Sequence, residues 1–121
     1  MENIEDIDPN ARQQLFNSFN SAALRVSIDT GHAHYAHSSN GAPPVDYFDQ
    51  AAGSLLEHVL LQNADGCADR HWALVEGNVG WQAVFRALGE LAHKPRLVLE
   101  LPNKVGIPAS MRMLEAAGLA E

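Results

Sequence analysis

The chain alternates three short β-prone runs with longer segments of helical periodicity, and this alternation is the feature that most limits its fold. The β-prone runs lie at 24–29, 58–63 and 96–101, and each ends in or near a polar residue. Short strands that alternate with helices of about ten residues are typical of parallel βαβ architecture. The sequence therefore predicts an α/β fold with parallel strands.

Helices are expected where apolar residues recur every three or four positions. Asp8 and Pro9 begin the first of them, Gly53 weakens the middle of the second, and Gly118 stands where a helix commonly ends. Two polar segments are expected to be loops, and the longer one has the length typical of functional loops. The expected helices lie at 9–20, 44–56, 81–91 and from 108 to just before 118, and the expected loops at 31–41 and 64–80.

Composition narrows the class of protein. The chain has 121 residues, which allows one globular unit, and a net charge of −7, which disfavours binding to the phosphates of nucleic acid. Cys67 is the lone cysteine and cannot form a disulfide within the chain, and no signal-peptide pattern occurs near Met1. No apolar run approaches membrane-spanning length. We therefore expect a cytoplasmic protein with neither a nucleic-acid partner nor a membrane partner.

Carboxylates stand at the ends of the expected strands. Asp29 ends the first run, Glu100 closes the third, and Glu2 precedes the first helix. In parallel α/β folds the carboxyl ends of the strands meet at one edge, where functional groups collect. These three carboxylates are expected to converge at that edge, which is called the mouth below. The alternative interpretation is that each only caps a strand or contacts a helix N-terminus.

Two short motifs place an imidazole close to a carboxylate. Asp29 and His32 form an Asp-x-x-His pair, and Asp69 and His71 flank an arginine on the long loop. Such pairs can bind one metal ion, although histidines on loops are more often solvated. Trp81 is expected to form part of the core or of a pocket wall.

Five segments occur along the chain in the order Glu2-Asn3, Val26–His34, Ala68–His71, Glu76–Trp81 and Leu97–Glu100. Together they resemble the sugar phosphate isomerase/epimerase group of xylose-isomerase-like TIM barrels, whose relatives include zinc-dependent apurinic endonucleases of family 2. The resemblance extends over essentially the whole chain and implies the C-terminal portion of a (β/α)8 barrel, from the end of strand 5 through helix 8. A complete barrel needs about 250 residues, so the first four strands are absent from this sequence.

The resemblance also implies a site. It assigns a divalent ion (Mn, Mg, Co or Zn) to Glu2, Asp29 and Glu100, and makes the two glutamates the catalytic acid and base. His32, Asp69, His71 and Trp81 would contact the substrate, a small sugar or sugar phosphate.

Two positions depart from the family pattern. Leu60 stands where the family has a metal-binding histidine, and Val75 stands where it usually has a glycine. His58 shares the strand face of Leu60, but it would lie about 6.6 Å deeper in the barrel and could not replace the missing ligand. Residue 60 is expected in the same layer as Asp29 and Glu100. Any ion would then be weakly held.

Three functions therefore remain open. The first is an isomerase or epimerase that moves a proton next to a sugar carbonyl and that loses activity through the truncation and the missing histidine. The second is a phosphodiester hydrolase of the apurinic-endonuclease type, and the third is a non-catalytic remnant or assembly module. In each case self-association is expected, because half a barrel leaves strand edges uncovered.

Overall fold

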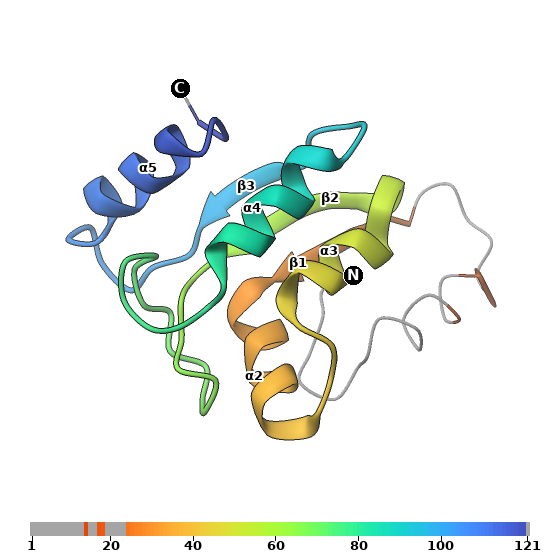
Figure 1. Ribbon diagram of the computed structural model, residues 1–121, viewed down its shortest axis with the longest axis horizontal. Coiled ribbons are helices and arrows are strands. Elements are labelled where there is room, and N and C mark those ends of the chain that lie inside the picture. The colour runs from red at the N-terminus through yellow and green to blue at the C-terminus, as the bar shows by residue number, and fades with distance from the viewer. Residues whose placement is uncertain (1–13, 15–16, 19–23, 121) are drawn as a thin grey trace.

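The computed structural model of the chain describes residues 14, 17–18 and 24–120 (Figure 1). Gln14, Asn17 and Ser18 are helical, and the rest of the helix expected at 9–20 lies outside the described residues, as does Glu2. Three parallel strands form one sheet in the order β1-β2-β3. They are β1 (Val26–Asp29), β2 (Leu56–Leu61) and β3 (Arg96–Leu99). The parallel α/β prediction and its three strands are confirmed.

One face of this sheet carries the hydrophobic core. The helices α3 (Val45–Ala52) and α4 (Trp81–Glu90) lie across that face in Figure 1, and α5 (Ile107–Ala116) follows β3. The core combines alternate residues of the strands with the apolar faces of these helices. The buried strand residues include Val26, Ile28, Val59 and Leu61, and the buried helix residues include Phe48, Val84, Leu88 and Leu114.

The segment expected to be a polar, histidine-rich loop is instead the helix α2 (Thr30–Asn40). The carboxylate of Asp29 caps its N-terminus by accepting a hydrogen bond of 2.9 Å from the backbone N–H of His32. Gly41, at φ 73°, ends the helix in the left-handed conformation. The buried side of α2 consists of small residues, namely Thr30, Gly31, Ala33 and Ala36. Without large apolar side chains, the helical period was not visible in the sequence.

The second expected helix is shorter than its apolar spacing suggested. It ends at Ala52, and Gly53, at φ 52°, leads into a single 3-10 turn over Gly53–Leu55. Leu56, which was expected to continue the helix, begins β2 and is fully buried. The glycine therefore ends the helix rather than weakening its middle.

The long loop that follows β2 was expected at 64–80, and the structure confirms it between β2 and α4. Asn63 organises it from within. Its side-chain oxygen accepts hydrogen bonds from the N–H groups of Ala64 and Val79, and its amide donates to the carbonyl of Leu74. These bonds hold both ends of a long segment against the end of β2.

Candidate functional site

The face of the sheet away from the core bears the polar residues of the strand ends. Asp29 pairs with Leu60 across β1 and β2, and Leu60 pairs with Val98 on β3. The expectation that residue 60 shares the layer of Asp29 is confirmed. Glu100 lies two residues beyond Val98, so the expectation that it shares that layer is wrong.

His58 lies in the next layer of the sheet, on the side away from the carboxyl ends of the strands. It pairs with Ser27 on β1 and Arg96 on β3, two residues before Leu60. His58 is therefore one layer deeper than Leu60, as expected from strand geometry. Its imidazole does not belong to the set of polar groups at the strand ends.

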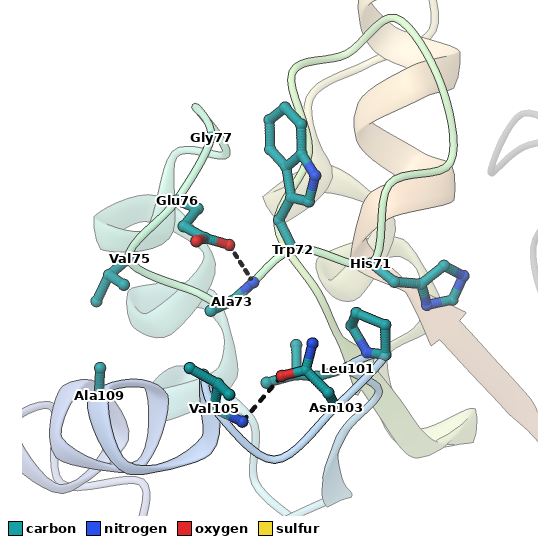
Figure 2. A pocket seen from close by; sticks show the side chains of 12 residues that line it. His71, Trp72, Ala73, Val75, Glu76, Gly77, Leu101, Asn103, Val105 and Ala109 are labelled. Carbon is teal, nitrogen blue, oxygen red and sulfur yellow. Dashed lines mark hydrogen bonds between the residues drawn. The ribbon is translucent and has the colours of Figure 1, made fainter.

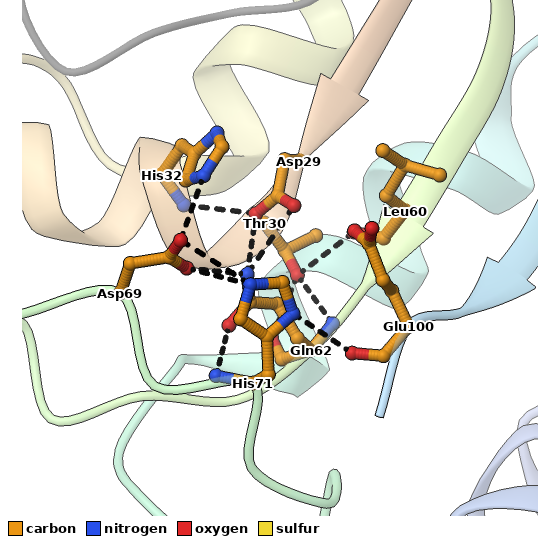
Figure 3. A network of polar contacts seen from close by, with 8 residues as sticks. All are labelled: Asp29, Thr30, His32, Leu60, Gln62, Asp69, His71 and Glu100. Carbon is orange, nitrogen blue, oxygen red and sulfur yellow. Dashed lines mark hydrogen bonds and ion pairs between the residues drawn. The ribbon is translucent and has the colours of Figure 1, made fainter. Parts of the chain in front are cut away.

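Gln62 lies at the centre of the mouth (Figure 3) and was not identified from the sequence. Its side-chain nitrogen is 3.1 and 3.2 Å from the two carboxylate oxygens of Asp29 and 2.9 Å from Oδ1 of Asp69. The backbone N–H of His71 donates to its side-chain oxygen at 2.6 Å. The hydroxyl of Thr30 accepts from the Gln62 N–H at 3.0 Å and donates to its carbonyl at 2.7 Å.

These contacts fix which way the Gln62 amide faces. A backbone N–H can only donate, and a carboxylate can only accept, so the oxygen must face His71 and the nitrogen must face the two aspartates. Gly31, in the first turn of α2, leaves the space for this amide, because a Cβ there would overlap it. The sequence signal was a polar residue directly after a buried strand, but its partners are distant in sequence.

Asp69 joins the two histidines that the sequence singled out. Its Oδ2 is 3.3 Å from Nε2 of His32, and a carboxylate oxygen lies 3.2 Å from Nε2 of His71. Burial by itself would raise the pKa of Asp69, but the hydrogen bond from Gln62 and the charges of the two histidines outweigh it and lower that pKa. The structure therefore brings His32, Asp69 and His71 together and joins the two motifs, which the sequence presented as separate pairs.

His71 lies between two acceptors. Its Nδ1 is 3.1 Å from the backbone carbonyl of Glu100, and its Nε2 faces Asp69. Burial alone would lower the pKa of His71, but the Glu100 carbonyl and the charge of Asp69 act more strongly together and raise it. Its backbone is in the left-handed region at φ 54°, which turns the ring back towards the strands.

Asp29 and Glu100 come from strands on either side of β2, and their carboxyl groups lie close enough for Asp29 to raise the pKa of Glu100. Desolvation raises the pKa of the Glu100 carboxyl, and the hydrogen bond with Asp29 and the charge of Asp29 raise it further. Asp29 is fully buried and accepts hydrogen bonds from His32 and Gln62. The Glu100 carboxyl therefore keeps its proton to a higher pH than an ordinary glutamate does.

The donors that the described residues supply at the mouth do not fit a divalent metal ion. Within residues 24–120 no group of three or more His, Cys, Asp or Glu side chains is arranged to hold one. Both oxygens of Asp29 face an amide nitrogen that carries hydrogens and cannot be a ligand. Leu60, next to Asp29 in the sheet register, has no donor atom. Glu2, the third expected ligand, lies outside the described residues.

A cleft of about 700 Å³ opens beside the mouth (Figure 2). It lies between the loop that follows β2 and the loop that follows β3, and His71 forms one part of its wall. Val75, which replaces the family glycine, lines this cleft with 58% of its surface exposed, so the larger side chain is accommodated without burial. Trp81 lies elsewhere, in the core at the start of α4, stacked on Phe85 with ring centroids 5.5 Å apart.

Comparisons with known proteins agree with the fold of the chain. The structure is similar to a D-tagatose 3-epimerase-like protein, with a TM-score of 0.81, 21% identity and coverage of 96% of this chain and 45% of that one. It is also similar to a protein from Thermus thermophilus soaked with ZnCl2, with a TM-score of 0.72, 26% identity and coverage of 96% and 42%. A comparison with curated protein sequences finds no match.

The chain thus spans less than half the length of the solved structures that it matches, at 45% and 42%. Within the described part of the chain, no helix is both long and apolar enough to cross a membrane. The profile of one family, described as xylose isomerase-like TIM barrel, matches residues 2–117. This match covers nearly the whole chain, and the chain therefore belongs to the xylose isomerase-like TIM barrel family.

Proposed function

We propose that this chain is the C-terminal half of a sugar isomerase or epimerase barrel, from the end of strand 5 through helix 8, in which Glu100 moves a proton next to a sugar carbonyl. One observation carries the proposal: Asp29 and Glu100, from strands on either side of β2, bring their carboxyl groups to the same mouth, where Asp29 raises the pKa of Glu100. Paired carboxylates whose environments differ are typical of general acid and base catalysis.

The roles follow from the contacts. Asp29 accepts hydrogen bonds from His32 and Gln62, and its charge raises the pKa of Glu100 towards the range useful for proton transfer. In its ionised form Glu100 removes the proton from the carbon, the electrons of the C–H bond form a carbon–carbon double bond, and the carbonyl electrons move onto the oxygen to give an enediolate. A protonated carboxyl then returns a proton to carbon, and Glu2 is the group that the family resemblance offers for the opposite face. No step in this scheme passes through a metal ion.

Substrate contacts are assigned to the polar groups around this pair. His32, Asp69 and His71 present two imidazoles and a carboxylate beside Glu100. Groups of this kind bind the hydroxyls of a sugar through directional hydrogen bonds. The cleft next to His71 has room for a small sugar at about 700 Å³.

Proton exchange is the direct test. Ketoses such as D-tagatose and D-fructose, with their 6-phosphates, would be incubated with the chain in D2O, and loss of the carbon-bound proton would be followed by NMR. We expect exchange with the parent and its loss in Glu100→Gln. Glu115→Gln, on the exposed surface of α5, is the matched control and should keep the activity. Absence of exchange with every sugar, in folded protein, would contradict the proposal.

Phosphodiester hydrolysis is the second candidate, and one observation favours it. The Asp29–His32 and Asp69–His71 pairs, separate in sequence, join in one network at the mouth. The net charge of −7 opposes binding to a DNA duplex, so we rank this function lower. A plasmid that contains abasic sites tests it: incision by the parent that is lost in Asp69→Ala would reverse the ranking.

A further inference from the structure

We infer that the side-chain amide of Gln62 takes the place of a cation between Asp29 and Asp69, and that this chain therefore organises its mouth without a divalent ion. The inference is independent of the sugar chemistry proposed above. Failure of the proton-exchange assay would leave it standing, and an ion bound in place of the amide would overturn it whatever that assay gave.

The amide nitrogen bridges two carboxylates at once. It lies 3.1 and 3.2 Å from the oxygens of Asp29 and 2.9 Å from Oδ1 of Asp69, on separate segments of the chain. A primary amide carries two N–H donors, which is the number needed to serve one carboxylate each. Two carboxylates held this close to one buried point repel each other unless a positive or hydrogen-bearing group lies between them.

The amide is held firmly in that position. Gln62 is 0% exposed, and its side-chain oxygen is bound by the N–H of His71 at 2.6 Å. Its backbone is bound in both directions by the hydroxyl of Thr30. An ion that entered between the aspartates would have to displace this amide and leave its buried donors without acceptors.

The strand position beside Asp29 offers no further ligand for an ion that displaced the amide. Leu60, beside Asp29, offers no donor atom, and His58 lies one layer deeper. The change Gln62→Glu would convert the bridging donor into a third carboxylate among Asp29 and Asp69. Such an oxygen-rich site suits a hard cation such as Mn²⁺.

Two measurements test the inference with Mn²⁺ as the probe. In the parent, titration with MnCl2 should leave the Gln62 side-chain amide signals in ¹⁵N NMR unbroadened and the melting temperature unchanged. In Gln62→Glu, calorimetry should show Mn²⁺ binding at least about tenfold tighter than in the parent. The melting temperature of that variant should rise with Mn²⁺, because an ion that binds only the folded state stabilises it.

Gln62→Leu is the matched control, because it removes the amide without adding an oxygen, and it should gain no affinity. Stoichiometric Mn²⁺ that broadens the Gln62 amide signals of the parent would overturn the inference, and this measurement does not depend on any variant folding. Binding by Gln62→Glu no tighter than by Gln62→Leu would overturn it as well. If Gln62→Glu folds only when Mn²⁺ is added, the coupling of folding to binding supports the inference.

Discussion

Gly31 and Gln62 depend on each other at the mouth. A Cβ at residue 31 would overlap the Gln62 amide, which makes hydrogen bonds to Asp29, Asp69 and His71. We expect Gly31→Ala to lower the free energy of unfolding by roughly 1–3 kcal/mol, because either the amide leaves its partners or the helix moves. Denaturant titration measures this change.

Gly89 provides the matched control for that substitution. It lies on the exposed side of α4, and a Cβ there meets nothing within 4 Å. Gly89→Ala should raise stability by about 0.5–1 kcal/mol, because alanine favours the helix. Equal effects of the two substitutions would show that the space beside Gln62 does not matter.

His71 makes the stability of the chain dependent on pH. Its pKa is raised above the usual 6.5, since both ring nitrogens face acceptors. A group whose pKa is raised on folding contributes stability that is complete below its unfolded pKa and is lost as the pH rises through its folded pKa. We therefore expect His71→Asn to lower the free energy of unfolding more at about pH 6 than at about pH 9. Both measurements use metal-free buffer.

Asparagine suits this comparison, because it tolerates the left-handed backbone of residue 71. An NMR titration of the ring gives the pKa directly, and Asp69→Asn should shift it back downward. A ring that titrates below 6.5 in the parent would contradict the expectation.

At the scale of elements, the strands could be predicted from the sequence and α2 could not. A strand with one buried face shows its period in its apolar residues, as in β1 and β2. The helix α2 buries small residues instead, and contact with a helix N-terminus was only one of two interpretations of Asp29, the other being a functional carboxylate. Asp29 does both, since the same side chain caps the helix and binds Gln62.

One part of the candidate site could likewise be predicted from the sequence, and another part could not. The convergence of Asp29 and Glu100, and of His32 with Asp69 and His71, follows from the rule that strand ends meet at one edge. The central position of Gln62 depends on the loop after β2, which folds back so that Asp69 and His71 contact the Gln62 side chain. No local sequence pattern predicts this fold of the loop.

Asn63 is the residue on which that loop depends. Its side chain, with the residue only 2% exposed, binds Ala64, Leu74 and Val79. Asn63→Leu would leave these buried backbone groups without partners and should cost about 2–4 kcal/mol. Hydrogen exchange at the amides of Ala64 and Val79 should become faster.

Asn103→Ala is a suitable control for the loop, because Asn103 is exposed and its side chain accepts a hydrogen bond from the N–H of Val105 within its own short loop. A change within about 0.5 kcal/mol is expected there. If Asn63→Leu left the exchange of Ala64 and Val79 unchanged, the loop would not be organised through Asn63.

For the whole molecule, the sheet has helices on one face and a second face that the described residues leave largely open. In that part of the chain β1 and β3 each pair only with β2, so each has a free edge. Leu60 and Val98 lie on the open face, and Val98 is 36% exposed. Parallel sheets are normally covered on both faces, so this arrangement needs a partner surface.

We therefore predict that the 13.1 kDa chain self-associates, with the open face and the β3 edge in the interface. Light scattering coupled to gel filtration should give a mass of about two chains or more, since association is the simplest way to cover a free parallel edge. Val98→Lys should shift the mass towards one chain, because it places a charge where apolar surface would be buried. Val105→Lys, at a loop position that is 86% exposed, should not. A parent that elutes at the mass of one chain and melts in a single cooperative transition would show that three strands suffice for a stable monomer. The proposed catalytic half-barrel would then have to act with its second face open to solvent.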